Sequence, residues 1–269
     1  MSLLGLHYSS GKSHHRRFMK ILLTNDDGIY AEGIYALYKE LKKIGQVTVV
    51  APESERSSVG HGITLSHPIW QKKVNRKGRF FGHAISGTPA DCVKFAVGII
   101  LKAKPDIVVS GINLGPNEGC SVFYSGTVAG AREGALMNIP SFAVSLATFV
   151  NPDFSYASRI STRIIRHMAR QKIPSHTLLN INVPNVKAAR IKGVRLTKQC
   201  MVPIHGTFRK RFDPNLKDYY WLTGKVPLKR KNLTIDAYAL SLNYVTVTPI
   251  RIDSTDYDFL KSFPNLPVT

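Results

Sequence analysis

Asp26 and Asp27 are adjacent in the sequence, directly after a short apolar segment, and Asn25 and Gly28 flank them. Two neighbouring carboxylates repel each other, and a cation bound between them removes that repulsion. Carboxylate oxygens are hard ligands, which favours Mg²⁺ or Mn²⁺ over zinc. The structural alternative is that the two aspartates only cap the following turn or helix. The pair alone leaves both interpretations open.

Two more polar, glycine-containing segments, 53–60 and 110–117, follow predicted strands. In open parallel sheets the ligand lies beyond the carboxyl ends of the strands. We therefore expect these segments to meet the aspartate pair at one edge of the sheet. Their presence favours the metal-site interpretation over simple capping.

A third segment, Ser125-Gly126-Thr127, opens a predicted helix. The N-terminus of a helix presents free N–H groups and a partial positive charge, which together suit a phosphate. Gly126 would let the backbone approach a ligand closely. The alternative is ordinary N-capping by Ser125 or Thr127.

The elements that must position these residues follow from the hydrophobic pattern. A strand, a helix and a second strand within about 35 residues form a βαβ unit. We predict a three-layer, Rossmann-like α/β sandwich on a mainly parallel sheet, with a β-rich C-terminal extension. The predicted core strands are 20–24, 46–51, 106–110, 141–146 and 177–183, the helices 32–43, 88–102, 125–137 and 156–169, a hairpin 63–74 with 79–85, a loop 111–124, and a last strand 244–248.

The predicted domain organisation is one α/β domain over 19–257. Residues 1–18 are expected to be a disordered extension, and residues 258–269 a tail. Within the domain, a β arm at about 185–240 carries dense basic runs. Exposed extended arms of this kind often pair with a partner subunit.

Composition narrows the class of protein. The formal net charge of +20 would suit nucleic acid or an anionic small substrate. A basic nucleic-acid-binding protein without catalysis is therefore the rival prediction, although it leaves the acidic pair unexplained. Three widely spaced cysteines favour a reducing compartment. No apolar stretch is long enough to span a bilayer, so we expect a cytoplasmic protein without a membrane partner.

Other folds with an acidic or glycine-rich turn after the first strand fit less well. A dinucleotide-binding fold needs Gly-x-Gly-x-x-Gly there, and this chain has Asp-Asp-Gly. A receiver domain needs a phospho-accepting aspartate after a later strand, where this chain offers Ser110 and Asn113. Haloacid-dehalogenase-type phosphatases use Asp-x-Asp, whereas the acids here are adjacent.

Taken together, the motifs resemble those of the SurE family of stationary-phase survival proteins, which are metal-dependent nucleotidases. The resemblance covers roughly residues 19–257 and consists of several multi-residue motifs in the same order. These motifs are 24–29 (TNDDGI), 50–57 (VAPESERS), 87–93 (GTPADCV), 109–117 (VSGINLGPN), 124–128 (YSGTV), 179–184 (LNINVP) and 244–249 (YVTVTP).

The resemblance implies one divalent cation per subunit, Mg²⁺ or Mn²⁺, and a homodimer or homotetramer formed through the C-terminal arm. It implies release of phosphate from nucleoside 5′- and 3′-monophosphates, and possible action on short polyphosphate. Nucleic acid is not expected as a partner. Asp26 or Asp27 could also take a proton from the attacking water. The implied metal ligands are Asp26, Asp27, Ser57 and Asn113, the phosphate site is Ser125, Gly126 and Thr127, and Asn25 and Asn117 are candidate supporting residues.

Overall fold

A computed structural model describes residues 18–202, 205–225 and 231–263. The predicted N-terminal extension lies outside the described residues, apart from Phe18. The last six residues of the predicted tail, 264–269, lie outside them as well.

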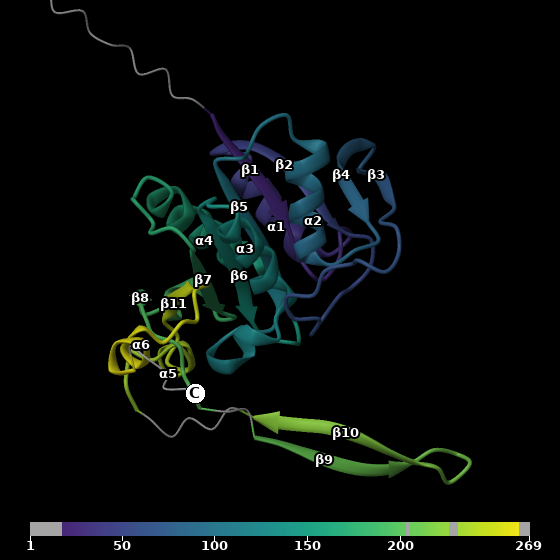
Figure 1. The fold of residues 1–269 in the computed structure, drawn as a ribbon, viewed down its shortest axis with the longest axis vertical. Helices are drawn as coiled ribbons and strands as arrows, with labels where there is room; N and C mark the ends of the chain where they lie inside the picture. Colours follow the sequence, from purple (N-terminus) through teal and green to yellow (C-terminus); the bar gives the residue numbers. More distant parts are fainter. Residues whose placement is uncertain (1–17, 203–204, 226–230, 264–269) are drawn as a thin grey trace, which may run out of the picture.

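The centre of the molecule is a nine-stranded sheet in the order β3-β4-β2-β1-β5-β6-β7-β11-β8 (Figure 1). Its strands from β4 to β7 run parallel to one another, β3 and β11 pair antiparallel to their neighbours β4 and β7, and β8 pairs parallel to β11. The mainly parallel α/β fold is therefore confirmed. The strands are β1 (Met19–Thr24), β2 (Gly45–Pro52), β3 (Gln71–Arg76), β4 (Arg79–Ile85), β5 (Ile107–Leu114), β6 (Ser141–Ala147), β7 (Thr177–Pro184), β8 (Val194–Leu196) and β11 (Val245–Arg251).

The strand order reverses beside β1. From β1 the chain proceeds to β2 and β4 on one side, then returns to place β5, β6 and β7 on the other. Such a switch point opens a crevice at the carboxyl ends of the two central strands, because their following loops diverge. The segments after β1 and β5 are the ones that carry the candidate site.

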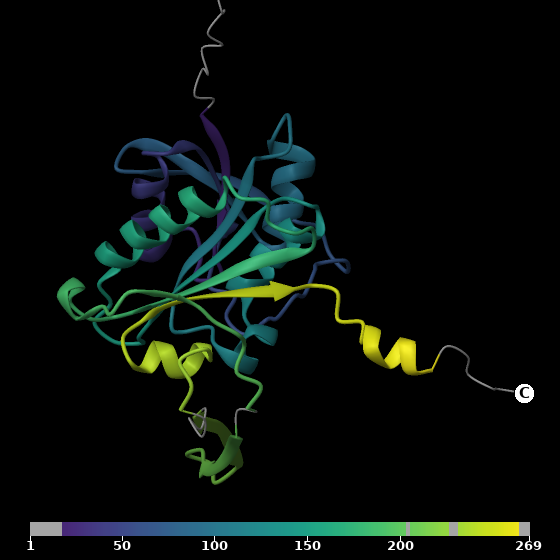
Figure 2. The same cartoon turned by 90° about the vertical axis from the view of Figure 1, so that its left-hand side faces the viewer.

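Helices cover both faces of the sheet (Figure 2). On one face α1 (Glu32–Leu41) packs against α4 (Phe154–Met168), and on the other α2 (Pro89–Phe95) packs against α3 (Gly126–Leu136). Apolar side chains of α1 and α4, such as Leu37 and Ile165, join the largest buried cluster. After α2 the chain continues as a π-helix, η1 (Ala96–Ile100), within the helix predicted to run to residue 102.

The predicted hairpin exists but is shorter than expected. Its first strand begins at Gln71, whereas residues 63–70 are irregular. Thr64 accounts for part of this difference, since its backbone N–H and its hydroxyl both bond the carboxylate of Asp91 in α2. The turn itself, Lys77-Gly78, has two positive φ angles (52° and 72°), which is the two-residue geometry that suits a twisted hairpin.

The predicted loop 111–124 is partly wrong. Strand β5 continues to Leu114, and a 3₁₀ helix, η2, spans Gly119–Phe123. The pairing of β5 with β6 is interrupted by a bulge between Gly111 and Asn113 and then resumes. A Cβ on Gly111 would lie 2.3 Å from the carbonyl oxygen of Val144, so only glycine fits at this bulge. Bulges beside sites re-aim side chains, and this one sets the direction of Asn113.

The predicted β-rich C-terminal extension is confirmed, and helices that were not predicted accompany it. A two-stranded hairpin, β9 (His205–Phe212) with β10 (Asp218–Lys225), extends away from the body (Figure 1). Two short helices, α5 (Asp236–Ser241) and α6 (Tyr257–Ser262), were not predicted, and α6 lies in the segment expected to be a tail. Long-range contacts hold α5, because the carboxylate of Asp236 accepts from the backbone N–H groups of Gly119 and Cys200.

Candidate functional site

The loops after β1, β2 and β5 and the start of α3 converge at the carboxyl edge of the sheet. Beyond Asp27, Gly28 has a φ of 93°, which takes the chain out of strand geometry. The carbonyl oxygen of Asp26 accepts a hydrogen bond of 2.7 Å from the backbone N–H of Arg56. Arg56 directly precedes Ser57 in the chain. These contacts join the predicted aspartate pair to the second polar segment.

Asp26 is almost fully buried under the first turn of α3. The hydroxyl of Thr127 donates a hydrogen bond to Oδ1 of Asp26. A Cβ on Gly126 would lie 2.8 Å from Cβ of Asp26 and 2.9 Å from its Oδ2. Helix α3 can therefore approach Asp26 this closely only because its first residue is glycine. The hydroxyl of Thr127 thus orients Asp26, a role that the prediction of a phosphate site did not include.

The aspartate pair is also joined to the end of β5. Oδ2 of Asp27 accepts from the backbone N–H of Leu114 at 3.1 Å, directly after Asn113. Asn113 donates through Nδ2 to the carbonyl oxygen of Gly115 at 2.7 Å, which leaves its amide oxygen for another partner. Ser57 donates its hydroxyl proton to Glu55 at 2.6 Å, so its oxygen lone pairs stay available.

Three loops therefore provide possible metal ligands, namely two carboxylates, an amide oxygen and a hydroxyl oxygen. Burial, and then the charge of Asp26, raise the pKa of Asp27 to about 7. Burial likewise raises the pKa of Asp26. Ionising both groups costs free energy that a bound cation would offset, and metal ligands must be deprotonated to bind. The donor set and the close approach of the carboxylates fit a hard divalent cation such as Mg²⁺ or Mn²⁺.

Softer metal sites are not present in the described part of the chain. Among residues 18–202, 205–225 and 231–263, no three His, Cys, Asp or Glu side chains are grouped so that they could hold a metal ion. The three cysteines are free thiols. A cation here would thus depend on the mixed set of two aspartates, a serine and an asparagine.

A cavity of about 730 Å³ opens above this donor set. Its polar wall includes Asp26, Ser57, Asn113 and Ser125. Ser125 is the N-cap of α3, and its Oγ accepts from the backbone N–H of Val128 at 3.0 Å. The earlier N–H groups of a helix have no partner within the helix. In α3 the N–H of Thr127 is hydrogen-bonded to Asp26, so the N–H of Gly126 is the one that can serve a ligand at this wall.

The two candidate supporting residues have different places. Asn25 donates to the carbonyl oxygen of Gly28 at 2.9 Å and stabilises the turn that carries the aspartates. Asn117 borders the cavity, but its polar atoms are bonded to Ser145, Asn180 and Asn182 of β6 and β7. The Asn25 side chain therefore holds the backbone of its turn, whereas the backbone of Asn117 is itself held by the Asn180 and Asn182 side chains and its own side chain donates to Ser145.

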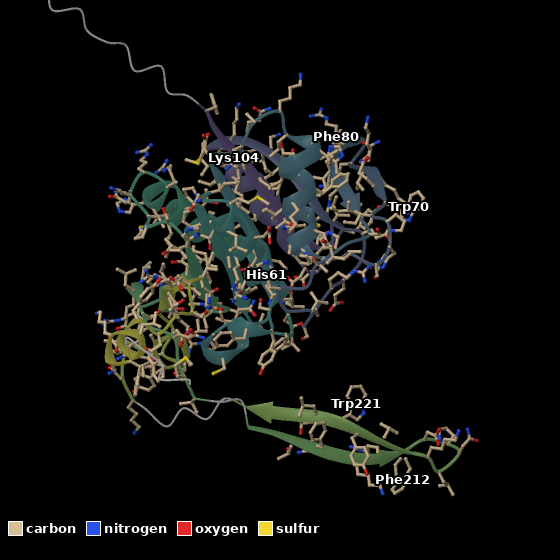
Figure 3. The ribbon with its side chains drawn as sticks, in the orientation of Figure 1. His61, Trp70, Phe80, Lys104, Phe212 and Trp221 are labelled. Carbon is tan, nitrogen blue, oxygen red and sulfur yellow. The ribbon has the colours of Figure 1, made fainter. Side chains whose placement is uncertain are left out.

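A network that sequence reasoning missed ties down the loop carrying Ser57. His61 lies in this loop, and Figure 3 shows it near the centre of the body, well below Lys104 in that view. Its Nε2 lies 2.8 Å from Oε2 of Glu133 in α3, and Lys94 of α2 lies 2.9 Å from the other carboxylate oxygen. The one signal in the sequence was Glu133 itself, the only acidic residue in a helix of mostly small residues.

Glu133→Gln is expected to lower the free energy of unfolding by about 2 kcal/mol at pH 7, because a buried, charge-assisted pair of contacts is lost. Burial opposes ionisation of Glu133, but the hydrogen bonds and charges of His61 and Lys94 outweigh it. The pKa of Glu133 is therefore below its ordinary value of 4.5. Its contribution is present above that ordinary value and is lost as the pH falls through the folded-state pKa.

Urea unfolding of the wild type and of Glu133→Gln at pH 7 and at pH 3.5 measures the difference between their free energies of unfolding. This difference should be smaller at pH 3.5. The matched control is Glu40→Gln, which removes an exposed ion pair with Lys43. Such surface pairs contribute little to stability. Equal losses for the two variants would show that the Glu133 network does not stabilise the fold.

The fold and the site define a three-layer α/β protein with a ligand cavity at the switch point of its sheet, bordered by Asp26, Ser57 and Asn113. Comparison with known proteins agrees. The family model described as Survival protein SurE matches residues 21–205. A solved structure of the SurE protein from Aquifex aeolicus superposes with a TM-score of 0.80 at 38% identity and covers 90% of this chain and 97% of that one. The chain belongs to the SurE family.

Two curated relatives carry the name 5′-nucleotidase SurE. That of Syntrophobacter fumaroxidans is 48% identical over 242 residues, which are 90% of this chain and 97% of that protein. That of Chlorobaculum tepidum is 46% identical over 239 residues, which are 89% of this chain and 91% of that protein. The resemblance inferred from the sequence motifs is thus confirmed over nearly the whole length of both relatives. No helix in the described ranges is long and apolar enough to cross a membrane.

Proposed function

We propose that this chain is a divalent-metal-dependent nucleotidase that hydrolyses nucleoside 5′- and 3′-monophosphates to nucleoside and phosphate. The observation that carries the proposal is the cavity itself. Three predicted metal ligands (Asp26, Ser57 and Asn113) border the same cavity as Ser125 at the start of α3. The names of the two relatives, 5′-nucleotidase SurE, support the same activity.

Each part of the site has a distinct role in this proposal. A divalent cation held by Asp26, Asp27, Ser57 and Asn113 would neutralise phosphoryl oxygens and lower the pKa of a bound water. The N–H of Gly126, at the start of α3, binds a phosphate oxygen and stabilises the charge that develops on it. Thr127 keeps Asp26 in one orientation through its hydroxyl. Either Asp26 or Asp27 accepts the proton of the attacking water.

A phosphate-release assay with AMP, its 3′ isomer and tripolyphosphate tests the proposal. We expect turnover of both monophosphates with Mg²⁺ or Mn²⁺ and loss of that turnover in EDTA, restored by excess metal. Activity that persists after exhaustive chelation would contradict the metal site. Release of phosphate from tripolyphosphate would extend the activity to short polyphosphate.

The rival prediction is that the chain is a basic nucleic-acid-binding protein without catalysis, and its expected results are the opposite of those for the nucleotidase. It requires no phosphate release and tight, steeply salt-dependent binding of DNA or RNA. The same preparation, titrated with a labelled oligonucleotide at two salt concentrations, separates the two functions.

We also propose that two copies associate through the C-terminal arm, as a dimer or as half of a tetramer. The β9–β10 hairpin of this arm extends from the body (Figure 1). Helix α6, which follows the arm in the chain, also stands away from the body in Figure 2, and apolar side chains on it are about half exposed. These side chains are Tyr257, Phe259, Leu260 and, just beyond the helix, Phe263. Buried in a second copy, they would gain the free energy of removing that surface from water. Sedimentation of the intact chain tests this association.

Cytoplasmic location stays a prediction, supported by the free thiols.

A further inference from the structure

Two of the three free thiols lie close together, although they are 80 residues apart in the chain. Sγ of Cys120 is 3.8 Å from the carbonyl oxygen of Cys200. A Cβ on Gly119 would lie 3.2 Å from Cβ of Cys200. Since Cys120 directly follows Gly119, the two cysteines occupy neighbouring positions on facing segments of backbone. The wide spacing of the cysteines in the sequence conceals this pair.

Hydrogen bonds fasten these two segments to each other beside the cysteines. The carboxylate of Asp236 accepts from the backbone N–H groups of Gly119 and Cys200, each at 2.9 Å. Gln199 donates through Nε2 to the carbonyl oxygen of Gly119, also at 2.9 Å. Asp236 is fully buried, so its bonds to both segments are shielded from water. The short separation between the two cysteines is therefore a fixed feature of the fold.

The three thiols differ in how readily they can react. Cys120 is partly exposed, so a dissolved oxidant can reach its sulfur. Cys200 is only 5% exposed, which leaves it accessible mainly to a group on a neighbouring residue. Cys92 is fully buried, and this burial raises its pKa well above the ordinary value. Because the thiolate is the reactive form, Cys92 should remain reduced when the other two react.

We propose that Cys120 and Cys200 form a reversible redox pair, which a small disulfide such as oxidised glutathione converts into an intramolecular disulfide. The thiolate of Cys120 attacks the small disulfide, forms a mixed disulfide and releases one small thiolate. The thiolate of Cys200 then attacks the sulfur of Cys120 and displaces the second small thiolate. The two protons lost by the cysteines protonate the two released thiolates. The protein pair thus loses two electrons, and the small disulfide gains them.

The geometry of the pair requires one local change for this bond. A disulfide needs Cβ atoms about 3.5–4.5 Å apart. The contact between Gly119 and Cβ of Cys200 shows that the backbones already approach this closely. The Cys120 side chain has to turn from the carbonyl oxygen of Cys200 to its sulfur, and the hydrogen bonds of Asp236 keep the two segments together while it does so.

The bond joins two parts of the molecule that are distant in the chain. Cys120 lies in η2, shortly before Ser125 and the start of α3. Cys200 lies between β8 and β9, at the base of the C-terminal arm. The disulfide therefore fastens the arm to the segment that leads into α3. Because it closes a loop of 80 residues, it restricts the unfolded chain, and the temperature of unfolding should rise by about 5–10 °C.

Mass spectrometry of the intact chain tests the pair. The protein is incubated with oxidised glutathione, unfolded, and treated with N-ethylmaleimide to label the remaining thiols. The monomer should carry one maleimide, in place of three for the protein kept in dithiothreitol. A digest made without reductant should contain the Cys120 peptide joined to the Cys200 peptide. Dithiothreitol should restore all three thiols and the lower temperature of unfolding.

Cys120→Ser should keep its two remaining thiols under the same oxidation, and its temperature of unfolding should not respond to the oxidant. Cys92→Ala is the matched control and should form the joined peptide as the wild type does. Glutathione attached to Cys120 alone, a bond between two chains, or three free thiols after oxidation would overturn the proposal. A joined peptide without a rise in the temperature of unfolding would overturn the fastening of the arm. None of these measurements depends on phosphate release, so they are independent of the nucleotidase proposal.

Discussion

Asp26→Asn is expected to reduce kcat for AMP about 1,000-fold, because the change removes one of two charges that hold the cation. The fold should persist, since an asparagine oxygen can still accept the hydrogen bond that Thr127 donates to Oδ1. Steady-state kinetics at saturating Mn²⁺ and far-ultraviolet circular dichroism measure the two effects separately. Calorimetry with Mn²⁺ should show at least a 10-fold loss of affinity.

The matched control for this variant is Asp106→Asn. Asp106 lies just before β5 at the opposite edge of the sheet, where its Oδ2 accepts from the backbone N–H of Lys20 at 2.7 Å. The Asp106→Asn variant has the same chemical change beside the same two central strands. Its kcat for AMP should match that of the wild type. If Asp26→Asn retained near-normal turnover, the metal-site proposal would be wrong.

Gly126→Ala is expected to lower kcat/KM at least 100-fold, since the added methyl group has no space. Its carbon would lie 2.8 Å from Cβ of Asp26 and 3.1 Å from the carbonyl oxygen of Arg56. Either Asp26 moves or the start of α3 withdraws from the phosphate position. Displacements of about 1 Å at a reacting centre cost on the order of 100-fold in rate.

The control for this change is Gly98→Ala, because a Cβ on Gly98 would have nothing within 4 Å. That variant should keep full activity. Thermal unfolding of Gly126→Ala should remain cooperative, so that a loss of activity reports the site and not global unfolding. Wild-type kinetics in Gly126→Ala would show that α3 does not need to approach Asp26 this closely.

Much of the fold was predictable because its core elements are locally specified. The predicted strand 20–24 and helix 32–43 correspond to β1 and α1 within two residues at each end. A buried parallel strand has a continuous apolar run, and an amphipathic helix has its own period, so each pattern is written in consecutive residues. The parallel order and the switch point then follow from the alternation of strands and helices.

The candidate site was predictable to the level of loops but not of contacts. The sequence placed the aspartate pair at the end of a strand and Ser125–Thr127 at the start of a helix. It could not show that Thr127 bonds Asp26, or that His61 reaches Glu133, because these residues are about 100 and 70 positions apart. The bulge that directs Asn113 depends on how β5 pairs with β6, which is likewise a tertiary property.

The sequence by itself determined the chemistry on offer, namely two adjacent carboxylates, polar loops after apolar strands and a glycine-containing helix start, together with membership of the family. Only the tertiary structure decided what these groups do to one another. It buried Asp26 under α3, raised the pKa of Asp27 to about 7, and brought Asp26, Ser57, Asn113 and Ser125 to the wall of one cavity. The physical reason is that propensity and hydrophobic period act between neighbours in the chain, whereas burial, charge repulsion and cavity shape depend on residues that meet only after folding.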